Sequence, residues 1–336
     1  MPEREDTEDM AECVGKTPVI ERIRYEEPDG RIGNCYLVVS GAEAGIIGLP
    51  LHERATRAEI QRRLDAWAVD PSRLKLLFTH AHEGRLTRIP SFLPEKCPVY
   101  IGAQDLPNLT GTSSRRFLTC LYLREGFPPE QVRVYEQILQ IQEEVQQNLN
   151  YQPVQNGAEI PIGEVTLRGI HTPGHTRGHI CYLLPEEGLL FTGDMLQYDG
   201  TPSVELWPEG GSAVEKMLDS LDYMKELMVK RALPGHGDLT GEYRGRIQAI
   251  WNQYYLMILQ LYQTVNRSPG LSAYELLLSI LKQQKKQIPA SEQKKRRMMN
   301  ETVACLEFLR RRGYVQTVMQ DGILRNEPGE RSLTDF

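Results

Sequence analysis

The residues whose types could do chemistry are histidines and aspartates that directly follow predicted strands. They occur in four segments: His80-Ala81-His82, His171-Thr172-Pro173-Gly174-His175, Thr192-Gly193-Asp194 and Pro234-Gly235-His236. Five of the seven histidines lie in these segments, most of them close to Gly or Pro, where an imidazole has little reason to serve as packing. Imidazole and carboxylate groups are suited to zinc, iron or manganese. Because loops at strand ends present functional groups in α/β proteins, the pattern predicts a metal site there.

The elements that must position these residues are predicted from apolar runs and their periodicity. Helical spacing extends over residues 56–70, 112–150, 212–228 and 243–266, and 128–150 is an amphipathic helix that either covers the site or packs on an outer layer. Strands and helices alternate, so the chain is predicted to be an α/β protein. The predicted strands are residues 19–26, 34–41, 44–50, 73–80, 97–103, 164–172, 179–185, 188–194 and 230–234.

The C-terminal part of the chain has a different pattern. Helices are predicted at 271–283 and 291–312, followed by two short strands around the turn Asp321-Gly322, which is typical of a winged helix. Residues 281–325 hold eleven Lys and Arg against four Asp and Glu, a local charge of +7, which leaves −13 for the remainder. Such a basic module contacts nucleic-acid phosphates in some proteins and is a solvated helix face, a dimerisation module or a lid in others.

The segments HTPGHTRGH, FTGDML and LPGHGD, in this order and spacing, resemble the metallo-β-lactamase-fold superfamily. Within it, the chain is similar to the glyoxalase-II-like hydrolases with a C-terminal winged-helix extension, a group that includes the β-lactamase-like endoribonuclease. The resemblance runs from about residue 19 to 325 and implies a four-layer αββα sandwich with its metal site at one edge of the two sheets. It implies that His80, His82 and His175 bind the first metal, that Asp194 bridges, and that His236 binds the second metal.

The sequence departs from this family in its first motif. The family has HxHxDH, whereas this chain has HAHEGR, with Gly84 in place of an aspartate and Arg85 in place of a histidine. A second departure is Gly45-Ile-Ile-Gly-Leu-Pro50, where the family usually has an aspartate in an early strand. A second metal would therefore have too few protein ligands. The permanently charged guanidinium of Arg85 is expected to pair with Asp194 and replace that metal's charge.

These residues predict a mononuclear hydrolase that acts on an ester or thioester through a metal-bound hydroxide. One zinc ion is expected, with iron or manganese as the other candidates, held by His80, His82 and His175. Asp194 would orient or deprotonate the water, and Arg85 would stabilise the developing oxyanion. Of the remaining histidines, His171 is expected to be structural and His179 to orient a ligand or line the pocket.

Three alternatives stay open at this point. The first is a metal-dependent ribonuclease that holds RNA on the basic module, although phosphodiester cleavage generally draws on two metals. The second is a mononuclear iron oxygenase, in which one histidine of the first motif, His175 and Asp194 form a 2-His-1-carboxylate set, as in the persulfide dioxygenases of this fold. The third is a non-catalytic member with a degraded second metal site.

Composition sets the remaining expectations. The chain has 40% hydrophobic and 25% charged residues, as ordinary globular proteins do, and its apolar runs fall short of the roughly 20 residues that span a bilayer. The acidic start has no secretory apolar core, which predicts a cytoplasmic protein without a membrane partner. Six scattered cysteines without CxxC spacing predict reduced thiols. The expected domains are a disordered tail at 1–16, a metallo-β-lactamase-like domain at 17–266 and a winged-helix-like domain at 267–336; the oligomeric state stays open.

Overall fold

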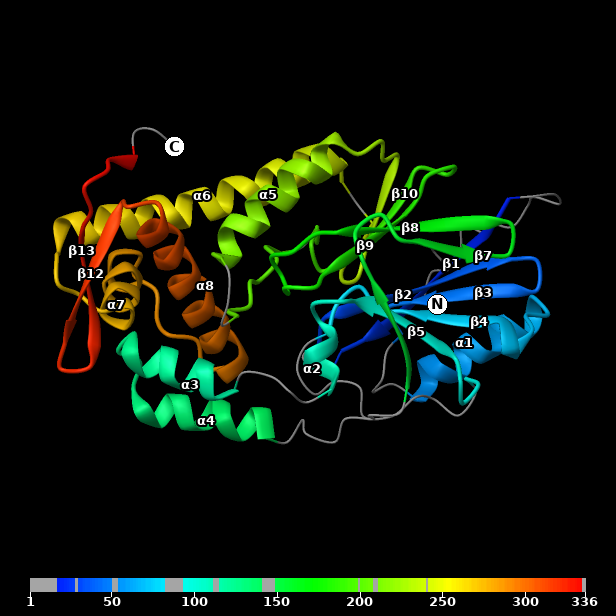
Figure 1. The fold of residues 1–336 in the computed structure, drawn as a ribbon, viewed down its shortest axis with the longest axis horizontal. Coiled ribbons are helices and arrows are strands. Elements are labelled where there is room, and N and C mark those ends of the chain that lie inside the picture. The colour runs from blue at the N-terminus through cyan, green and yellow to red at the C-terminus, as the bar shows by residue number, and fades with distance from the viewer. Residues whose placement is uncertain are drawn as a thin grey trace, which may run out of the picture.

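The computed structural model describes residues 17–27, 30–49, 54–81, 93–110, 115–140, 149–198, 200–207, 211–239 and 241–333. Over these residues, two β-sheets are stacked, with helices on their outer sides and a mainly helical region at one end (Figure 1). The chain has an α/β architecture, as the sequence predicts.

The first sheet is built mostly from the N-terminal part of the chain. Its strand order is β1-β2-β3-β4-β5-β6, antiparallel from β1 to β3 and parallel from β3 to β6. The second strand, β2, is buried along nearly its whole length, because both of its faces are covered. The strands are β1 (Val19–Glu26), β2 (Ile32–Ser40), β3 (Glu43–Ile47), β4 (Leu74–Leu77), β5 (Pro98–Gly102) and β6 (Asn150–Val154).

The second sheet has the order β11-β10-β9-β8-β7. Strands β7 to β10 are antiparallel neighbours, whereas β10 and β11 run parallel because α5 (Ala213–Glu226) connects them. The strands are β7 (Glu159–Ile162), β8 (Val165–His171), β9 (Ile180–Leu184), β10 (Leu189–Gly193) and β11 (Arg231–Pro234).

Three separate apolar clusters define the layers. Between the sheets, the ring of Tyr36 packs edge-on against Phe191 with centroids 5.3 Å apart. On the outer side of the first sheet, Ile60 and Leu64 of α1 (Arg54–Ala66) are buried. On the outer side of the second sheet lie α5 and α6 (Tyr243–Arg267). This order of helix, sheet, sheet and helix confirms the expected four-layer sandwich.

The third cluster continues into the C-terminal region. Here α7 (Ala273–Gln283), α8 (Glu292–Arg311) and the hairpin of β12 (Val315–Gln320) and β13 (Ile323–Pro328) pack beside α6. Residues from α3 (Arg115–Arg124) and α4 (Pro129–Gln140) belong to the same cluster. Glu125, which follows α3 and is fully buried, forms a bidentate ion pair with Arg310 of α8 at 2.5 and 2.8 Å. The division of the chain at residue 266 stays a prediction.

Some details differ from the sequence-based expectations. The helix expected over 128–150 is present as α4, but residues 141–148 lie outside the described residues and Asn150 already begins β6. Strands β6 and β7 were not predicted. Both are edge strands and contain a proline, which weakens a strand pattern in the sequence but is tolerated at a sheet edge.

The described residues bear on the cysteines and on membrane-spanning helices. Their cysteines, Cys35, Cys97, Cys120, Cys181 and Cys305, are all free thiols. None of the helices in the described ranges is long and apolar enough to cross a membrane.

Candidate metal centre

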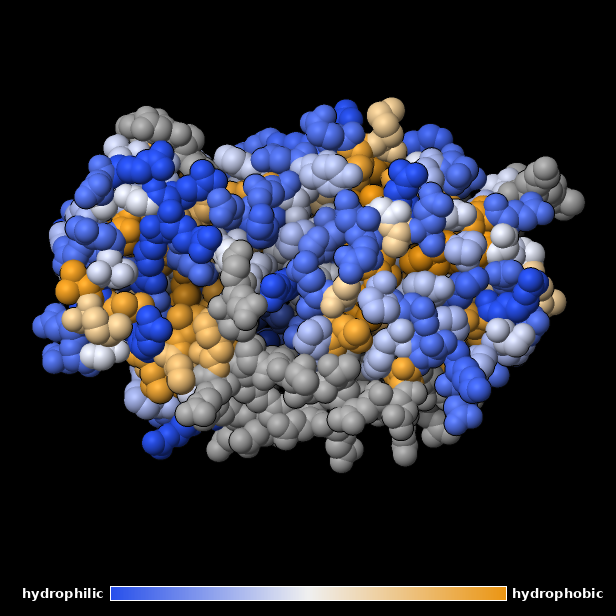
Figure 2. Space-filling view, viewed as in Figure 1, coloured by the Kyte–Doolittle hydropathy of each residue, from blue (hydrophilic) through white to orange (hydrophobic). Residues whose placement is uncertain are grey.

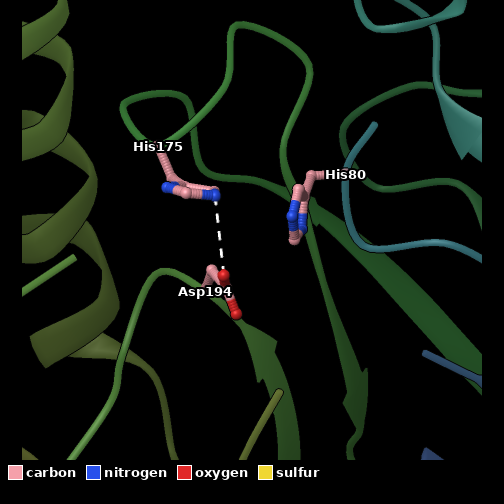
Figure 3. Close-up of side chains that lie close together, drawn as sticks. All are labelled: His80, His175 and Asp194. Atoms are coloured by element: carbon pink, nitrogen blue, oxygen red, sulfur yellow. Dashed lines mark ion pairs between the residues drawn. The ribbon is translucent and has the colours of Figure 1, made fainter. Parts of the chain in front are cut away.

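Three predicted ligand residues meet where the two sheets end. His80 follows β4 by three residues, His175 lies in the loop between β8 and β9, and Asp194 directly follows β10. One ligand atom from each lies within 4.8 Å of those of the others. Figure 3 shows the three side chains, each from a different loop, gathered around one space. Two imidazoles and a carboxylate are a donor set that suits zinc or iron, so the residues present fit a bound metal ion.

The ring of His175 is fixed by a backbone carbonyl. Its Nδ1 lies 2.8 Å from the carbonyl oxygen of Ser203, and because a carbonyl only accepts, Nδ1 carries the proton. The other nitrogen, Nε2, lies 3.6 Å from Oδ2 of Asp194 (Figure 3). In the neutral ring, this tautomer leaves the Nε2 lone pair directed toward the carboxylate, as a metal ligand requires.

His80 is held by contacts with neighbouring side chains. Its Nδ1 lies 3.0 Å from the hydroxyl of Thr79. Its ring packs edge-on against His175, with centroids 4.7 Å apart, and stacks on His179 at 5.3 Å. These contacts fix the plane of the His80 imidazole relative to the other ligand residues.

Asp194 is buried and lies between two histidines. Its Oδ1 accepts a hydrogen bond from Nδ1 of His236 at 2.6 Å, while Oδ2 faces His175. Burial would raise the pKa of Asp194, but the charge of His236 and its hydrogen bond hold that pKa well below the usual range. The carboxylate is therefore an anion at neutral pH.

His236 is the cationic partner in this pair. Burial lowers the pKa of a histidine, but the neighbouring Asp194 raises the pKa of His236 to about 10. Its other nitrogen, Nε2, is buried without a hydrogen-bond partner among the described residues, and lies 3.7 Å from Oε1 of Glu27. His236 is thus next to the three-residue cluster rather than part of it, and its role as a ligand of a second metal stays a prediction.

His179 is fully buried and contacts both Asp194 and His80. Because the backbone N–H of Asp194 donates to its Nε2 at 3.3 Å, the ring proton is on Nδ1, which donates to the hydroxyl of Thr172 at 3.0 Å. Burial, together with the charges of His80 and His175, lowers the pKa of His179 well below its usual range. This neutral histidine positions both the Asp194 backbone and the His80 ring, and its role in orienting metal ligands stays a prediction.

Asp105, which sequence reasoning missed, connects two of the ligand loops. Its carboxylate accepts hydrogen bonds from the backbone N–H of Ala81 at 3.1 Å, from the N–H of Gly178 at 2.6 Å and from the hydroxyl of Thr176 at 2.5 Å. Burial raises its pKa to about 7, although these three donors favour the anion. Asp105 follows β5 by three residues, so the signal that identified Asp194, an acid just after a strand, was also present here.

Three further residues singled out in the sequence, His171, His82 and Arg85, are not part of the described cluster. His171 lies apart from the cluster, and its Nε2 donates to the carbonyl of Arg177 at 3.0 Å, which is a structural role as expected. His82 and Arg85 lie outside the described residues, together with the Glu83-Gly84 pair between them. Their roles as first-metal ligand and as partner of Asp194 stay predictions.

A pocket of about 550 Å³ opens beside the centre and runs between the sandwich and α8. Figure 2 shows a hydrophilic hollow at this position, next to α8 as placed in Figure 1. The pocket is lined by Arg31, His175, Asp194, Gln197, Ser203, Val204, Glu205, Ser291, Gln293, Lys294, Arg296, Arg297 and Asn300. The C-terminal region therefore forms one wall of the space in front of the candidate metal ligands.

The fold and a match to a family model define the class of protein. Residues 28–236 match the model of the metallo-beta-lactamase superfamily, and the chain belongs to this superfamily. The fold is shared with a metallo-beta-lactamase family protein from Thermus thermophilus, with a TM-score of 0.73 and 23% identity over 92% of this chain and 98% of that one. It is also shared with a beta-lactamase domain protein from Burkholderia ambifaria, with a TM-score of 0.74 and 18% identity over 94% of each chain.

Several curated fungal proteins are similar in sequence. The atrochrysone carboxyl ACP thioesterase dmxR1 of Cryptosporiopsis sp. is 32% identical over 96 residues, which is 29% of this chain and 28% of the relative. An atrochrysone carboxyl ACP thioesterase of Emericella nidulans is 24% identical over 187 residues, 52% of this chain and 58% of the relative. The lactamase-like protein ptaB of Pestalotiopsis fici is 27% identical over 122 residues, 36% of this chain and 37% of the relative. In each case the match spans less than two thirds of the relative's length.

Proposed function

We propose that the chain is a metal-dependent hydrolase that cleaves a thioester with a single metal ion. The observation that carries this proposal is the meeting of His80, His175 and Asp194 at strand ends, with ligand atoms within 4.8 Å of one another. The substrate class is supported by the sequence similarity to fungal ACP thioesterases. His80, His175 and Asp194 would hold the metal, with His82 as a further ligand predicted from sequence.

A divalent metal in such a site supplies a Lewis acid and lowers the pKa of a coordinated water to about 7. The chain's own residues would do the rest. His236 holds a proton on Nδ1 and so keeps Asp194 ionised, while the Ser203 carbonyl keeps the His175 proton on Nδ1, away from the centre. Asp194 would orient the attacking water toward the thioester carbonyl carbon.

The reaction balances without any further reactant. Water adds its oxygen to the carbonyl carbon, the carbon–sulfur bond breaks, and the products are a carboxylic acid and a thiol. The proton that leaves the water ends on the sulfur. Asp194, the carboxylate of the described cluster, would accept a hydrogen bond from the attacking water, and because His236 holds the pKa of Asp194 low, the proton would reach the sulfur through solvent.

Arg85 would stabilise the negative charge that develops on the carbonyl oxygen, as predicted from its place in HAHEGR. Arg85→Ala is expected to lower kcat about 100-fold with a smaller change in KM, because a charge-stabilising donor acts in the transition state. Arg85→Lys keeps the charge and loses the planar fork, so it should recover only part of the rate. An unchanged kcat in Arg85→Ala would remove Arg85 from the proposal.

The function is tested by thioester hydrolysis with the full chain before chelation, after chelation, and after zinc, iron or manganese is restored. Release of free thiol should fall to background on chelation and return with one metal. His175→Ala should stay inactive after metal is restored, whereas His171→Ala, which alters a histidine outside the cluster, should keep most of the activity. Hydrolysis that survives complete chelation, or no hydrolysis with any of the three metals, would contradict the proposal.

A second candidate is a mononuclear iron oxygenase. The observation in its favour is that the cluster itself is two histidines and one carboxylate, the ligand set of non-haem iron(II) oxygenases. Oxygen uptake by the iron-loaded chain with a thiol or persulfide, and no thioester cleavage with zinc, would favour this candidate over the hydrolase.

A further inference from the structure

The pocket beside the metal centre has two walls of different character. One wall belongs to the sandwich and carries His175 and Asp194. The other comes from the first half of α8 and from the residue that precedes this helix, Ser291. A substrate that reaches the candidate metal ligands through this pocket must therefore pass along α8.

The α8 wall is cationic. Lys294, Arg296 and Arg297 line the pocket, and Arg31 lines it from the sandwich side. The pocket also has two carboxylates, those of Asp194 and Glu205, which leaves the cations in excess. The N-terminal end of a helix adds a partial positive charge to the same wall.

The four basic side chains in this part of α8 divide into two kinds. Arg297 pairs with Glu301 at 2.7 Å and donates to the carbonyl of Thr201, so it connects α8 to the loop that follows Asp194. Lys295, which does not line the pocket, pairs with Glu292 at 2.6 Å. These two are structural.

Lys294 and Arg296 are different. Both line the pocket, and neither forms an ion pair with another residue in the part of the chain that the structure describes. Lys294 is exposed and Arg296 is half-buried, so their charges are available to a ligand in the pocket. An anion there would gain charge-assisted hydrogen bonds that these side chains do not make with the described residues.

We infer that Arg296 and Lys294 bind the phosphate of a phosphopantetheine arm that delivers the thioester to the metal centre. The inference rests on the proposed thioesterase function, since biological acyl thioesters are carried on this arm, either in coenzyme A or on an acyl carrier protein. The arm is a thin chain with the thioester at one end and a phosphate at the other. The pocket offers complementary groups to both ends, the metal ligands for the thioester and the α8 cations for the phosphate.

The test compares matched thioesters of one acyl group on pantetheine, on phosphopantetheine, on coenzyme A and on an acyl carrier protein, using the metal-loaded full chain. The phosphorylated arm should have a KM about tenfold lower than pantetheine, which lacks the phosphate. Arg296→Ala and Lys294→Ala should each raise the KM for the phosphorylated thioesters about five- to tenfold and leave the pantetheine thioester unchanged. Arg296→Lys, which keeps the charge, should recover part of the difference.

Arg311→Ala is the matched control, because it removes an exposed cation from the same helix about 22 Å further along its axis, outside the pocket. It should leave every KM unchanged. Equal KM values for the pantetheine and phosphopantetheine thioesters in the unmodified chain would overturn the inference while leaving thioester hydrolysis intact. A lower KM for the coenzyme A thioester or for the carrier-protein thioester identifies the natural source of the arm, and either result supports the inference.

Binding of free coenzyme A, measured by calorimetry, separates this inference from the proposed function. If no thioester is hydrolysed, the proposed function fails, and coenzyme A binding that is lost in Arg296→Ala would still support the phosphate site. If a single-stranded oligoribonucleotide binds more tightly than coenzyme A and this binding is lost in Arg296→Ala, the α8 wall is an RNA-binding surface. The inference is then overturned.

Discussion

The carboxylate of Asp105 accepts the backbone N–H of Gly178 at 2.6 Å, and through this bond a buried acid on one sheet holds the ligand loop of the other. The close approach depends on glycine, because a Cβ at Gly178 would lie 2.3 Å from the backbone nitrogen of Asp105. The same carboxylate binds the N–H of Ala81, next to His80. The spacing of His80 and His175 is therefore set by a residue that lies outside the cluster of His80, His175 and Asp194.

Asp105→Asn is expected to lower metal affinity about 10- to 100-fold, because an amide nitrogen cannot accept the N–H groups that the carboxylate accepts. Titration of the metal-free chain with zinc in competition with a chromophoric chelator measures the change. Asp219→Asn, an exposed aspartate on α5, is the control and should bind zinc as tightly as the unmodified chain. Unchanged affinity in Asp105→Asn would show that the two loops hold their spacing without this carboxylate.

The raised pKa of Asp105 predicts a pH dependence of stability. Its pKa is about 7 in the folded chain against 3.8 for an ordinary aspartate, so the folded state binds more protons between these values. The stabilisation from its neutral form is fully present below pH 3.8 and is lost as the pH rises through about 7. The metal-free chain should therefore lose stability relative to Asp105→Asn between about pH 4 and pH 7, as measured by urea unfolding. A constant difference between the two chains over this range would mean that the carboxyl is not held in its neutral form.

The ion pair of Glu125 and Arg310 should dominate the attachment of α3 to α8. Its bidentate geometry and the complete burial of Glu125 mean that removing one partner leaves an unpaired charge, so Glu125→Gln should lower the free energy of unfolding by about 3 kcal/mol. The control is Glu215→Gln, which breaks the more exposed pair with Arg312 and should cost less than about 1 kcal/mol. Equal losses in the two variants, measured by denaturant titration, would be inconsistent with a structural role specific to Glu125.

His236→Ala tests whether His236 is a ligand of a second metal or only a hydrogen-bond partner of Asp194. The structure has its Nδ1 hydrogen-bonded to Asp194 at 2.6 Å, so in a mononuclear site it acts through the carboxylate. The variant should keep one metal per chain, with an affinity lower by about tenfold because Asp194 loses its hydrogen-bond donor. Loss of one of two metals in this variant would instead make His236 a ligand of a second site.

The sequence predicts the site to the extent that its signals are local. HTPGHTRGH, FTGDML and LPGHGD place His175, Asp194 and His236 at strand ends, and the structure brings these segments together. Asp105 also follows a predicted strand, but it is the only acid or histidine in AQDLPNL, so this segment does not stand out as a candidate site. Its importance appears only when the Gly178 loop is seen to pass within hydrogen-bonding distance.

The parts that could not be predicted depend on long-range packing. The charge excess in residues 281–325 is visible in the sequence, where it is more typical of a solvated helix face than of an RNA surface. Only the packing of α8 against the sandwich shows that Lys294, Arg296 and Arg297 line the pocket, and of these only Arg297 forms an ion pair among the described residues. The buried pair of Glu125 and Arg310 joins residues 185 positions apart, a separation at which no periodicity gives a signal.

The central claim is that one metal is held by His80, His175 and Asp194, and it is tested most directly by the metal content per chain. Elemental analysis of the unmodified chain and of His175→Ala, both purified without added metal, gives this number. We expect one equivalent of metal in the unmodified chain and close to none in His175→Ala. Two equivalents in the unmodified chain, or an unchanged content in His175→Ala, would contradict it.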